Sequence, residues 1–436
     1  MKGFSLVLSL IEYLLMIFVI LDFNTPYAYA LGKNYYLTEI IIICILTLFF
    51  ILIVRYKLKR NIFKRWLLVF TPYYIAMILY FFVNVRSEKM INFATRFLIA
   101  IPILTMIFCI YNQKGDLFRI LKKFSLIMFW LSIISLFFWW FGSQLHVISP
   151  TGIITSYWGR EFNYPSYYGL YFERQTDNFL WISGFRNIGI FCEGPMFSLC
   201  LIFSLFTELF LYKFERKKTI YKNENKIYFK IYSSNFKRKI RIAILTITLF
   251  TTTSTTGIII FIVMNIIKYL FMNQKGNVKR ILKWIFAIVI VILGAYFINK
   301  LFIDKAGSNS WLIRMDDFRV GLKAWIKSPI IGNGYADWTS VESLMNRGIR
   351  TNNGFSNAIF TVLSQGGCVL FLVYLVPIIS YFRYGVKGRN KSVFVFGIIF
   401  LIEFIVTLFQ YTFLMMILLS FGYALIISNS KIFKFK

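Results

Sequence analysis

The feature that most constrains this chain is a series of apolar runs, each close to 20 residues long, that recurs from one end to the other. A helix of about 20 residues spans the hydrocarbon core of a bilayer, and it satisfies its backbone hydrogen bonds internally. Only 15% of the 436 residues are charged, whereas an average soluble chain carries about 25%. We therefore predict a polytopic integral membrane protein, an all-α helical bundle that forms a single domain over residues 1–436.

We expect about twelve transmembrane helices. The apolar runs are 4–21, 37–54, 66–84, 91–111, 124–141, 187–212, 242–254, 257–271, 284–302, 355–381, 393–409 and 412–428. The stretch 242–271 is too long for one crossing and short for two, so we divide it at the polar sequence TTTSTTG. The stretch 393–428 is divided at QYT.

The net charge of +31 is concentrated in short loops between the apolar runs. With the N-terminus inside, most Lys and Arg residues fall on the inner side, as the positive-inside rule requires. A nucleic-acid-binding protein would instead carry a continuous basic patch on a soluble fold, so we expect no nucleic-acid partner. The positive charge also favours contact with anionic membrane lipids.

Cysteine and histidine supply few ligands for a metal. The five cysteines form no CxxC pair and lie in or beside apolar runs, and His146 is the only histidine. The cysteines read as small packing residues. A zinc or di-iron site would have almost no ligands to use, so we expect no metal or other cofactor.

Two long loops are predicted on the outer side, at residues 142–186 and 303–354. The first is rich in Tyr, Trp and Gly. Long ordered loops are more often functional than decorative. The chemistry of this protein is therefore expected on the outer face.

The sequence GFRNIGIFCEGPMFS, at the start of the sixth apolar run, carries Arg186 and Glu193. Pro195 disfavours helix at Gly194 and suits the first turn of a helix that begins there. One interpretation is an arginine at the interface that pairs with the glutamate. The other is a broken helix start at which Arg186, the helix dipole and Glu193 hold an anionic ligand beside a base.

Residues 311–327 are predicted to form an amphipathic helix that lies on the membrane and ends before Pro329. Its apolar positions follow a 4,3,4,3 spacing: Trp311, Met315, Phe318, Leu322 and Trp325. Arg319, Lys323 and Lys327 recur every four residues along another face. The helix either anchors to anionic lipid or offers guanidinium groups to a phosphate ligand.

Other polar residues also require a reason. Asn352 and Asn353 stand where the chain re-enters the membrane, and asparagine there is often only a helix cap. The TTTSTTG hydroxyls either satisfy a helix break or line a polar cavity. Glu403, in the middle of an apolar run, indicates a functional group or a buried pair. Gly366 and Gly367, in the middle of a predicted helix, are expected to let a neighbouring helix approach closely.

In this order, these stretches resemble the polysaccharide polymerase and O-antigen ligase family, over roughly residues 180–380. The family motif Arg-x-x-Gly-x-Phe-x-Glu-Pro is similar to RNIGIFCEGP. Ser254 and Gly257 loosely match a polar, serine-centred break. Arg314, Phe318 and PIIGNG match an outer-loop motif, and NNGFSNAIFTVLSQGG matches the last one.

Two positions depart from the family pattern. Many members have Arg after the central serine, where this chain has Thr255. The ligases have His at the re-entry position, where this chain has Asn352. The second departure weakens the ligase interpretation and leaves Glu193 as the nearest candidate for a general base.

The resemblance implies a GT-C-like enzyme in the bacterial plasma membrane, with its active site on the outer face. Such enzymes transfer a glycan from undecaprenyl diphosphate to a lipid-linked repeat unit, with no nucleotide sugar and no obligatory metal. A chain-length regulator protein is a further expected partner. The product would be a capsule, exopolysaccharide or O-antigen.

The resemblance also suggests roles for individual residues. Arg186 and Arg314 are expected to grip the diphosphate, and Glu193 to orient or deprotonate the acceptor, or to hold Arg186 in place. The aromatic loop SYWGREFNYPSYYGLYFER is expected to stack on sugar rings. The substrate-binding candidates are Arg160, Ser254, Arg319, Asn352 and Asn353.

Three rival functions remain. A flippase or transporter would bind its substrate near the membrane midplane and often shows inverted repeats, which we do not find. A ligase would have the same architecture and a different acceptor. A structural scaffold would not need the charged segment that contains Arg186 and Glu193.

Overall fold

The computed structural model describes residues 2–31, 36–56, 58–157, 161–179, 182–211, 224–271, 309–348, 350, 354–387 and 390–428. These residues are mostly helical. The chain divides into two compact units. Unit 1 comprises residues 1–120, 155–162 and 309–436, and unit 2 comprises 121–154 and 163–308. The single domain predicted over the whole chain stays a prediction.

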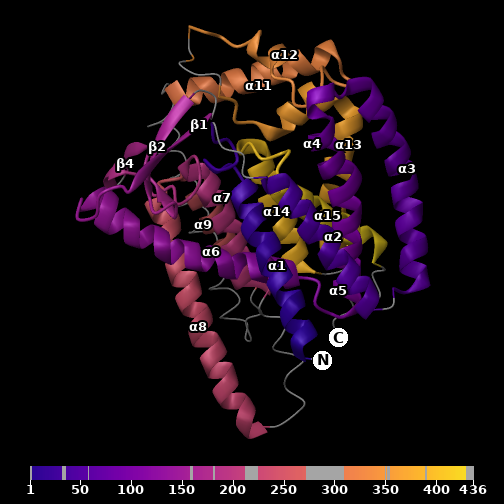
Figure 1. Cartoon of the computed structure of the whole chain (residues 1–436), viewed down its shortest axis with the longest axis horizontal. Coiled ribbons are helices and arrows are strands. Elements are labelled where there is room, and N and C mark those ends of the chain that lie inside the picture. The colour runs from indigo at the N-terminus through magenta and orange to yellow at the C-terminus, as the bar shows by residue number, and fades with distance from the viewer. Residues whose placement is uncertain are drawn as a thin grey trace. The chain divides into compact units, whose positions relative to one another are not determined.

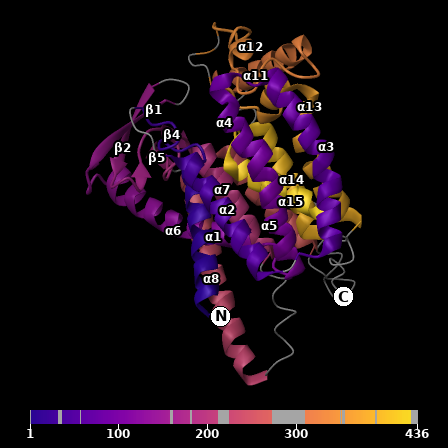
Figure 2. The ribbon, with the colours of Figure 1, turned by 45° about the vertical axis from the view of Figure 1, so that its right-hand side comes forward.

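Unit 1 is a bundle of helices with a helix pair at one end. Its helices are α1 (Lys2–Asp22), α2 (Leu37–Arg55), α3 (Arg60–Asn84), η1 (Ser87–Lys89), α4 (Met90–Phe93), the π-helix η2 (Ala94–Ala100), α5 (Ile101–Gln113), α11 (Asn309–Lys327), α12 (Thr339–Glu342), α13 (Ala358–Lys387), α14 (Lys391–Val406) and α15 (Phe413–Ile427). Within it, α13 packs on α14 and α15, α15 on α5, and α1 on α2. Figures 1 and 2 show α11 and α12 lying across the end of the bundle next to α13.

Helix α13 is interrupted at Gly367, which has φ 60° and ψ −167°. The segment 329–334, which carries the PIIGNG sequence, docks against this break. The amides of Cys368 and Val369 donate to the carbonyls of Pro329 and Ile330, at 2.9 and 3.0 Å. A Cβ atom at Gly367 would overlap the Ile330 carbonyl, so the site requires glycine. The predicted close approach at the glycine pair is therefore confirmed, although the neighbour is a loop and not a helix.

Unit 2 contains α6 (Arg119–Phe138, whose first two residues belong to unit 1), the π-helix η3 (Trp139–Gln144), α7 (Gly194–Phe206), the π-helix η4 (Thr207–Leu211), α8 (Glu224–Thr251) and α9 (Thr255–Phe271). Proline in the first turn of α7 confirms the helix start predicted at Pro195. The interval between α8 and α9 lies within TTTSTTG, which confirms the predicted break.

Five short strands occupy the described part of the loop between η3 and α7. They are β1 (Gly152–Tyr157), β2 (Glu161–Tyr167), β3 (Tyr171–Phe172), β4 (Thr176–Phe179) and β5 (Ile182–Phe185). β1, β2 and β3 form one sheet, and β4 pairs antiparallel with β5. The prediction of an all-α chain was therefore wrong for this loop. Its Tyr, Phe, Thr and Ile residues favour extended backbone. Each strand is short, however, so the alternation of apolar and polar residues that identifies a strand is not visible in the sequence.

Seven helical segments among the described residues are long and apolar enough to cross a membrane. They are Ser5–Asp22, Leu37–Arg55, Arg60–Asn84, Ser87–Gln113, Arg119–Gln144, Gly194–Leu211 and Ala358–Lys387. Each corresponds to one of the twelve predicted runs. Four further runs fall on α8, α9, α14 and α15, which are shorter or less apolar. The run 284–302 lies outside the described residues, so the count of twelve stays a prediction.

Candidate functional site

The segment 186–194 of unit 2 leads from β5 into α7 and is fixed mainly by its backbone. The Arg186 amide donates to the Gln175 carbonyl at 2.8 Å, and the Asn187 amide donates to the Thr251 carbonyl at 3.0 Å. Glu193 is the extended residue before α7, and its carbonyl accepts from the Met196 and Phe197 amides. The segment is thus an extended approach to the helix, as its proline predicted.

The Arg186 side chain lies against the start of α7. Its Nε donates to the Thr252 carbonyl at 3.0 Å. A Cβ atom at Gly194 would lie 2.8 Å from Arg186 Nη2 and 2.8 Å from the Thr252 carbonyl oxygen. Because residue 194 is glycine, the Arg186 guanidinium can lie beside the N-terminal end of α7. The charge of the guanidinium and the partial positive charge of the helix end together favour an anion.

Glu193 forms an ion pair with Arg174, a residue that the sequence motif does not include. Arg174 Nη1 lies 3.6 Å from Glu193 Oε1, and the two side chains are 13% and 28% exposed. Arg174 also donates to Tyr164 Oη and to the Cys192 carbonyl, both at 2.9 Å. Burial raises the pKa of Tyr164 well above its usual range, so its hydroxyl stays neutral. The contact to Glu193 is longer than these two Arg174 hydrogen bonds, so the Glu193 carboxylate is loosely held, and it is partly open to solvent.

Of the three consecutive polar residues after β3, Arg174 and Gln175 contact the segment 186–194, whereas Glu173 binds within the preceding loop. The Glu173 carboxylate accepts from Ser143 Oγ at 2.7 Å and from Tyr167 Oη at 2.9 Å. Arg174 faces Glu193, and Gln175 Oε1 accepts from the Gly194 amide at 3.5 Å. The adjacent polar residues Glu173, Arg174 and Gln175, which directly follow the aromatic stretch 164–172, were the available sequence signal for these contacts.

Ser254 is buried at the break between α8 and α9. Its Oγ accepts from the Gly257 amide at 3.4 Å, and its carbonyl accepts from the Ile258 amide at 3.0 Å. These contacts are those of a helix cap. Of the two predicted uses of the TTTSTTG hydroxyls, satisfaction of the helix break therefore applies to Ser254.

Unit 1 holds the second group of predicted residues, on α11. Arg314 is exposed on this helix. Arg319 is half-exposed, and its Nη2 and Nε donate to Asp316 Oδ1 at 2.6 and 3.0 Å. The structure therefore gives Arg319 an internal carboxylate partner and leaves Arg314 facing outward.

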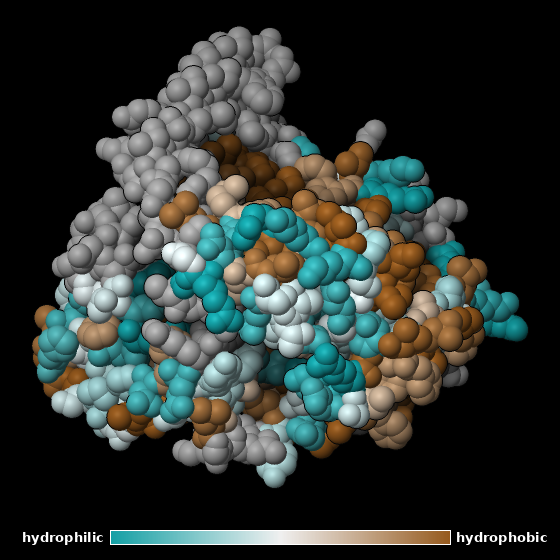
Figure 3. Space-filling model, turned by 90° about the horizontal axis from the view of Figure 1, so that it is seen from above, coloured by the Kyte–Doolittle hydropathy of each residue, from teal (hydrophilic) through white to brown (hydrophobic). Residues whose placement is uncertain are grey.

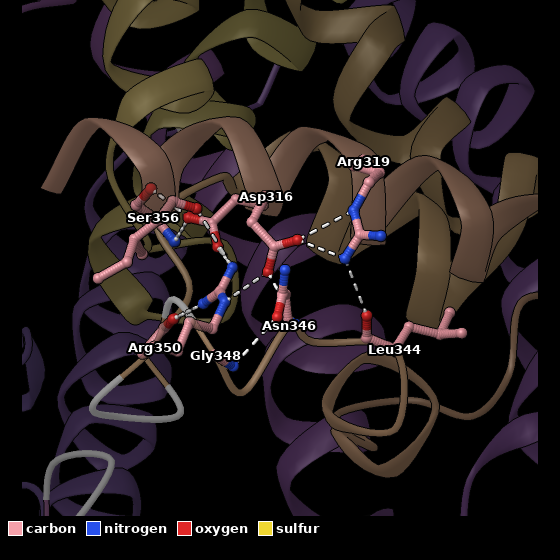
Figure 4. Close-up of polar contacts among 10 residues, drawn as sticks. Asp316, Arg319, Leu344, Asn346, Gly348, Arg350 and Ser356 are labelled. Carbon is pink, nitrogen blue, oxygen red and sulfur yellow. Dashed lines mark hydrogen bonds and ion pairs between the residues drawn. The ribbon is translucent and has the colours of Figure 1, made fainter. Parts of the chain in front are cut away.

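The most deeply buried charges near these residues are Asp316, Asp317 and Arg350, which we call the carboxylate clip (Figure 4). Arg350 Nε donates to Asp316 Oδ2 at 2.7 Å, and its Nη2 contacts Asp317 Oδ1. Ser356 Oγ donates to Asp317 Oδ2 at 2.6 Å. The clip therefore fastens α11 to the chain that leads into α13.

Asp316 remains ionised within the clip. Burial alone would raise its pKa, but hydrogen bonds from Arg350, the Asn346 amide and Arg319 outweigh that effect and lower the pKa below its usual value. Two adjacent aspartates on a helix, with Arg350 further along the same loop, were visible in the sequence. Their pairing could not be read from spacing because it depends on how the loop folds back.

Three predicted residues, Arg160, Asn352 and Asn353, lie outside the described residues. Nothing in the structure therefore bears on their expected substrate-binding roles. Arg186 and Glu193 lie close together in sequence and in unit 2, whereas Arg314 and Arg319 belong to unit 1.

Apolar helices of membrane-spanning length, with charged segments at their ends, define an integral membrane protein. Residues 240–375 of this chain match the family model described as O-Antigen ligase. This match confirms the resemblance to the O-antigen ligase and polymerase family. It includes the break at Ser254, α11 and the carboxylate clip. No curated protein matches the chain.

Proposed function

We propose that this protein is a polymerase of a bacterial surface polysaccharide that works on the outer face of the plasma membrane. The donor is a glycan on undecaprenyl diphosphate, and the acceptor is a sugar hydroxyl of a second lipid-linked repeat unit. A new bond forms between the acceptor oxygen and the anomeric carbon. The bond from that carbon to the diphosphate breaks, and undecaprenyl diphosphate leaves.

The observation that carries this proposal is the geometry of the segment 186–194. Arg186 lies beside the positive end of α7, which suits a departing diphosphate. Glu193 is the residue directly before α7. Its carboxylate is loosely paired with Arg174 and is partly exposed. We assign Glu193 to the acceptor hydroxyl, whose proton it accepts as the new bond forms. The leaving group already carries two phosphates, so the reaction requires no nucleotide sugar. The expected role of Arg314 on the diphosphate stays a prediction.

The test is Arg186→Lys in the native host, with the surface polysaccharide separated on a gel. Lysine keeps the charge but cannot grip phosphate with two parallel hydrogen bonds, so we expect single repeat units in place of long chains. Arg241→Lys is the matched control, because Arg241 is a partly buried arginine of the same unit whose side chain pairs with Glu208. Protein levels are measured by immunoblot for both variants. Normal chain length in Arg186→Lys would remove Arg186 from the reaction.

The ligase is the second candidate, favoured by the description of the matching family model. Deletion of the gene separates the two. A polymerase deletion leaves single repeat units on the surface acceptor, whereas a ligase deletion strands full-length chains on the lipid carrier. Repeat units trapped on the inner side would indicate a flippase and would contradict both proposals.

A further inference from the structure

The polarity of α11 is unusual for a helix on a protein surface, because its acidic residues point inward. Asp316 and Asp317 are buried together with Val320 and Ala324. Both carboxylates form ion pairs with Arg350 within the carboxylate clip. They are also the only acidic residues in the 19 residues of the helix. The exposed side of α11 therefore carries no negative charge.

The exposed side of α11 is instead apolar along one stripe. Its large apolar residues are each at least 38% exposed: Leu312, Met315, Phe318, Leu322 and Ile326. The stripe continues past the end of the helix with Ile330 and Ile331, which are 67% and 40% exposed. Contiguous exposed apolar residues of this kind mark a surface that is covered by another apolar phase.

A basic stripe runs beside the apolar one. Arg319, Lys323 and Lys327 recur every four residues and are exposed, so they form a single row along the helix. We call the two stripes together the outward face of α11. Figure 3 looks down on the end of unit 1 where α11 and α12 lie, and it shows hydrophilic and hydrophobic residues side by side there.

We propose that the outward face of α11 docks on anionic phospholipid at the membrane interface. The apolar stripe lies among the upper acyl segments, and the row of lysines binds the phosphate headgroups. The helix does not have the composition of a membrane span, so the interface is where both stripes are satisfied at once. A second protein would need an acidic and apolar surface, whereas an anionic bilayer supplies both properties.

The carboxylate clip determines which side of α11 faces the lipid. If the helix turned about its axis, Asp316 and Asp317 would meet the anionic headgroups and Arg350 would be left buried without its carboxylates. The clip therefore excludes the orientation that would repel the membrane. Each lysine near an anionic surface favours the docked position by about fivefold.

The test measures the depth of a nitroxide label at Leu322→Cys in the full-length chain, with the exposed Cys368 replaced by serine. The protein is reconstituted in vesicles of phosphatidylcholine, alone or mixed equally with phosphatidylglycerol. Accessibility to oxygen and to a water-soluble nickel complex reports depth. A label at Ser343→Cys, an exposed residue of the same unit, is the reference. We expect the label at 322 to favour oxygen, most strongly with phosphatidylglycerol, and the label at 343 to favour nickel.

The basic row is tested by Lys323→Gln combined with Lys327→Gln, which should lower the docked-to-undocked ratio about 25-fold. The matched control is Lys64→Gln combined with Lys387→Gln, since both lysines are exposed in the same unit. A label at 322 that favours nickel would overturn the proposal, as would a depth that does not respond to phosphatidylglycerol. Spin–spin broadening at 322 would assign the face to a second copy of the chain. A change seen only when undecaprenyl phosphate is added would assign it to the carrier lipid.

Discussion

Each unit contains an ion pair between arginine and carboxylate side chains, but the two ion pairs differ in burial and in the distance between the charged atoms. In unit 1, Arg350 is 2% exposed and contacts two carboxylates that are themselves buried. In unit 2, Arg174 and Glu193 lie 3.6 Å apart, and more than a quarter of the Glu193 side chain is exposed. A buried, fully hydrogen-bonded group serves the fold, whereas a loosely paired carboxylate remains available to a ligand. The two sites therefore predict opposite results when one charge is removed.

The largest effect is expected at Glu193. Glu193→Gln should lower polymer formation about 100- to 10,000-fold, as loss of a general base does. It should leave the melting temperature of the purified protein nearly unchanged, because partly exposed ion pairs contribute about 0–1 kcal/mol. Activity is measured in membranes with lipid-linked repeat units. Glu161→Gln, which removes an exposed carboxylate in β2, is the control. Activity retained in Glu193→Gln would move the base elsewhere.

Arg350→Ala should give the reverse pattern. Removal of Arg350 leaves Asp317 buried without a cation and Asp316 with Arg319 alone. Removal of one partner of a buried ion pair destabilises a protein by about 3–5 kcal/mol. The measurement is the free energy of unfolding in detergent, by denaturant titration. Arg347→Ala, at an exposed position of the same loop, should change it by less than about 0.5 kcal/mol. Equal stability of the two variants would mean that the carboxylate clip does not secure α11.

Gly194→Ala tests the position of the Arg186 side chain without changing any charge. The added methyl group would lie 2.8 Å from both Arg186 Nη2 and the Thr252 carbonyl oxygen, so the guanidinium must move. Overpacking of this kind destabilises by about 1–3 kcal/mol, and polymer formation should fall with it. Gly152→Ala is the control, since no atom lies within 4 Å of its added Cβ. Full activity in Gly194→Ala would show that the position of Arg186 is not critical.

The smallest effect is the pH dependence that Asp316 confers. Its pKa is lowered in the folded protein from a usual value of 3.8. Its contribution to stability is therefore complete above that value and is lost as the pH falls through the folded pKa. The free energy of unfolding should decline in this acidic range in the native protein and less steeply in Asp316→Asn. Parallel pH profiles for the two proteins would contradict the ionised state of Asp316.

Features that depend on local sequence were predictable. Apolar runs identified the seven long spans, Pro195 identified the start of α7, and TTTSTTG identified the break before α9. Each of these follows from backbone hydrogen bonding within a few residues. The glycine pair in α13 was recognised for a different reason, because residues without a side chain permit a close approach.

Features that depend on tertiary contacts were not predictable. The sequence places Arg186 seven residues before Glu193, yet the ion-pair partner of Glu193 is Arg174, which comes from another strand end. Likewise, Arg319 was predicted to bind phosphate, whereas in the structure its guanidinium forms an ion pair with Asp316. Spacing along a helix predicts which residues share a face, but it does not predict which side chains a folded loop brings to them.

The interruption of α13 at Gly367 has a consequence for exchanging parts between relatives. At the break, two backbone amides of α13 donate hydrogen bonds to the carbonyls of residues 329 and 330. In the opposite direction, the amides of Asn333 and Gly334 donate to the carbonyls of Ser364 and Gln365. A chimera that replaces the loop and keeps the helix, or the reverse, would separate donors from the acceptors that match them. The loop 329–334 and the helix segment 364–369 therefore form one transferable module, and swapped proteins that carry both should insert and fold where those that carry only one should not.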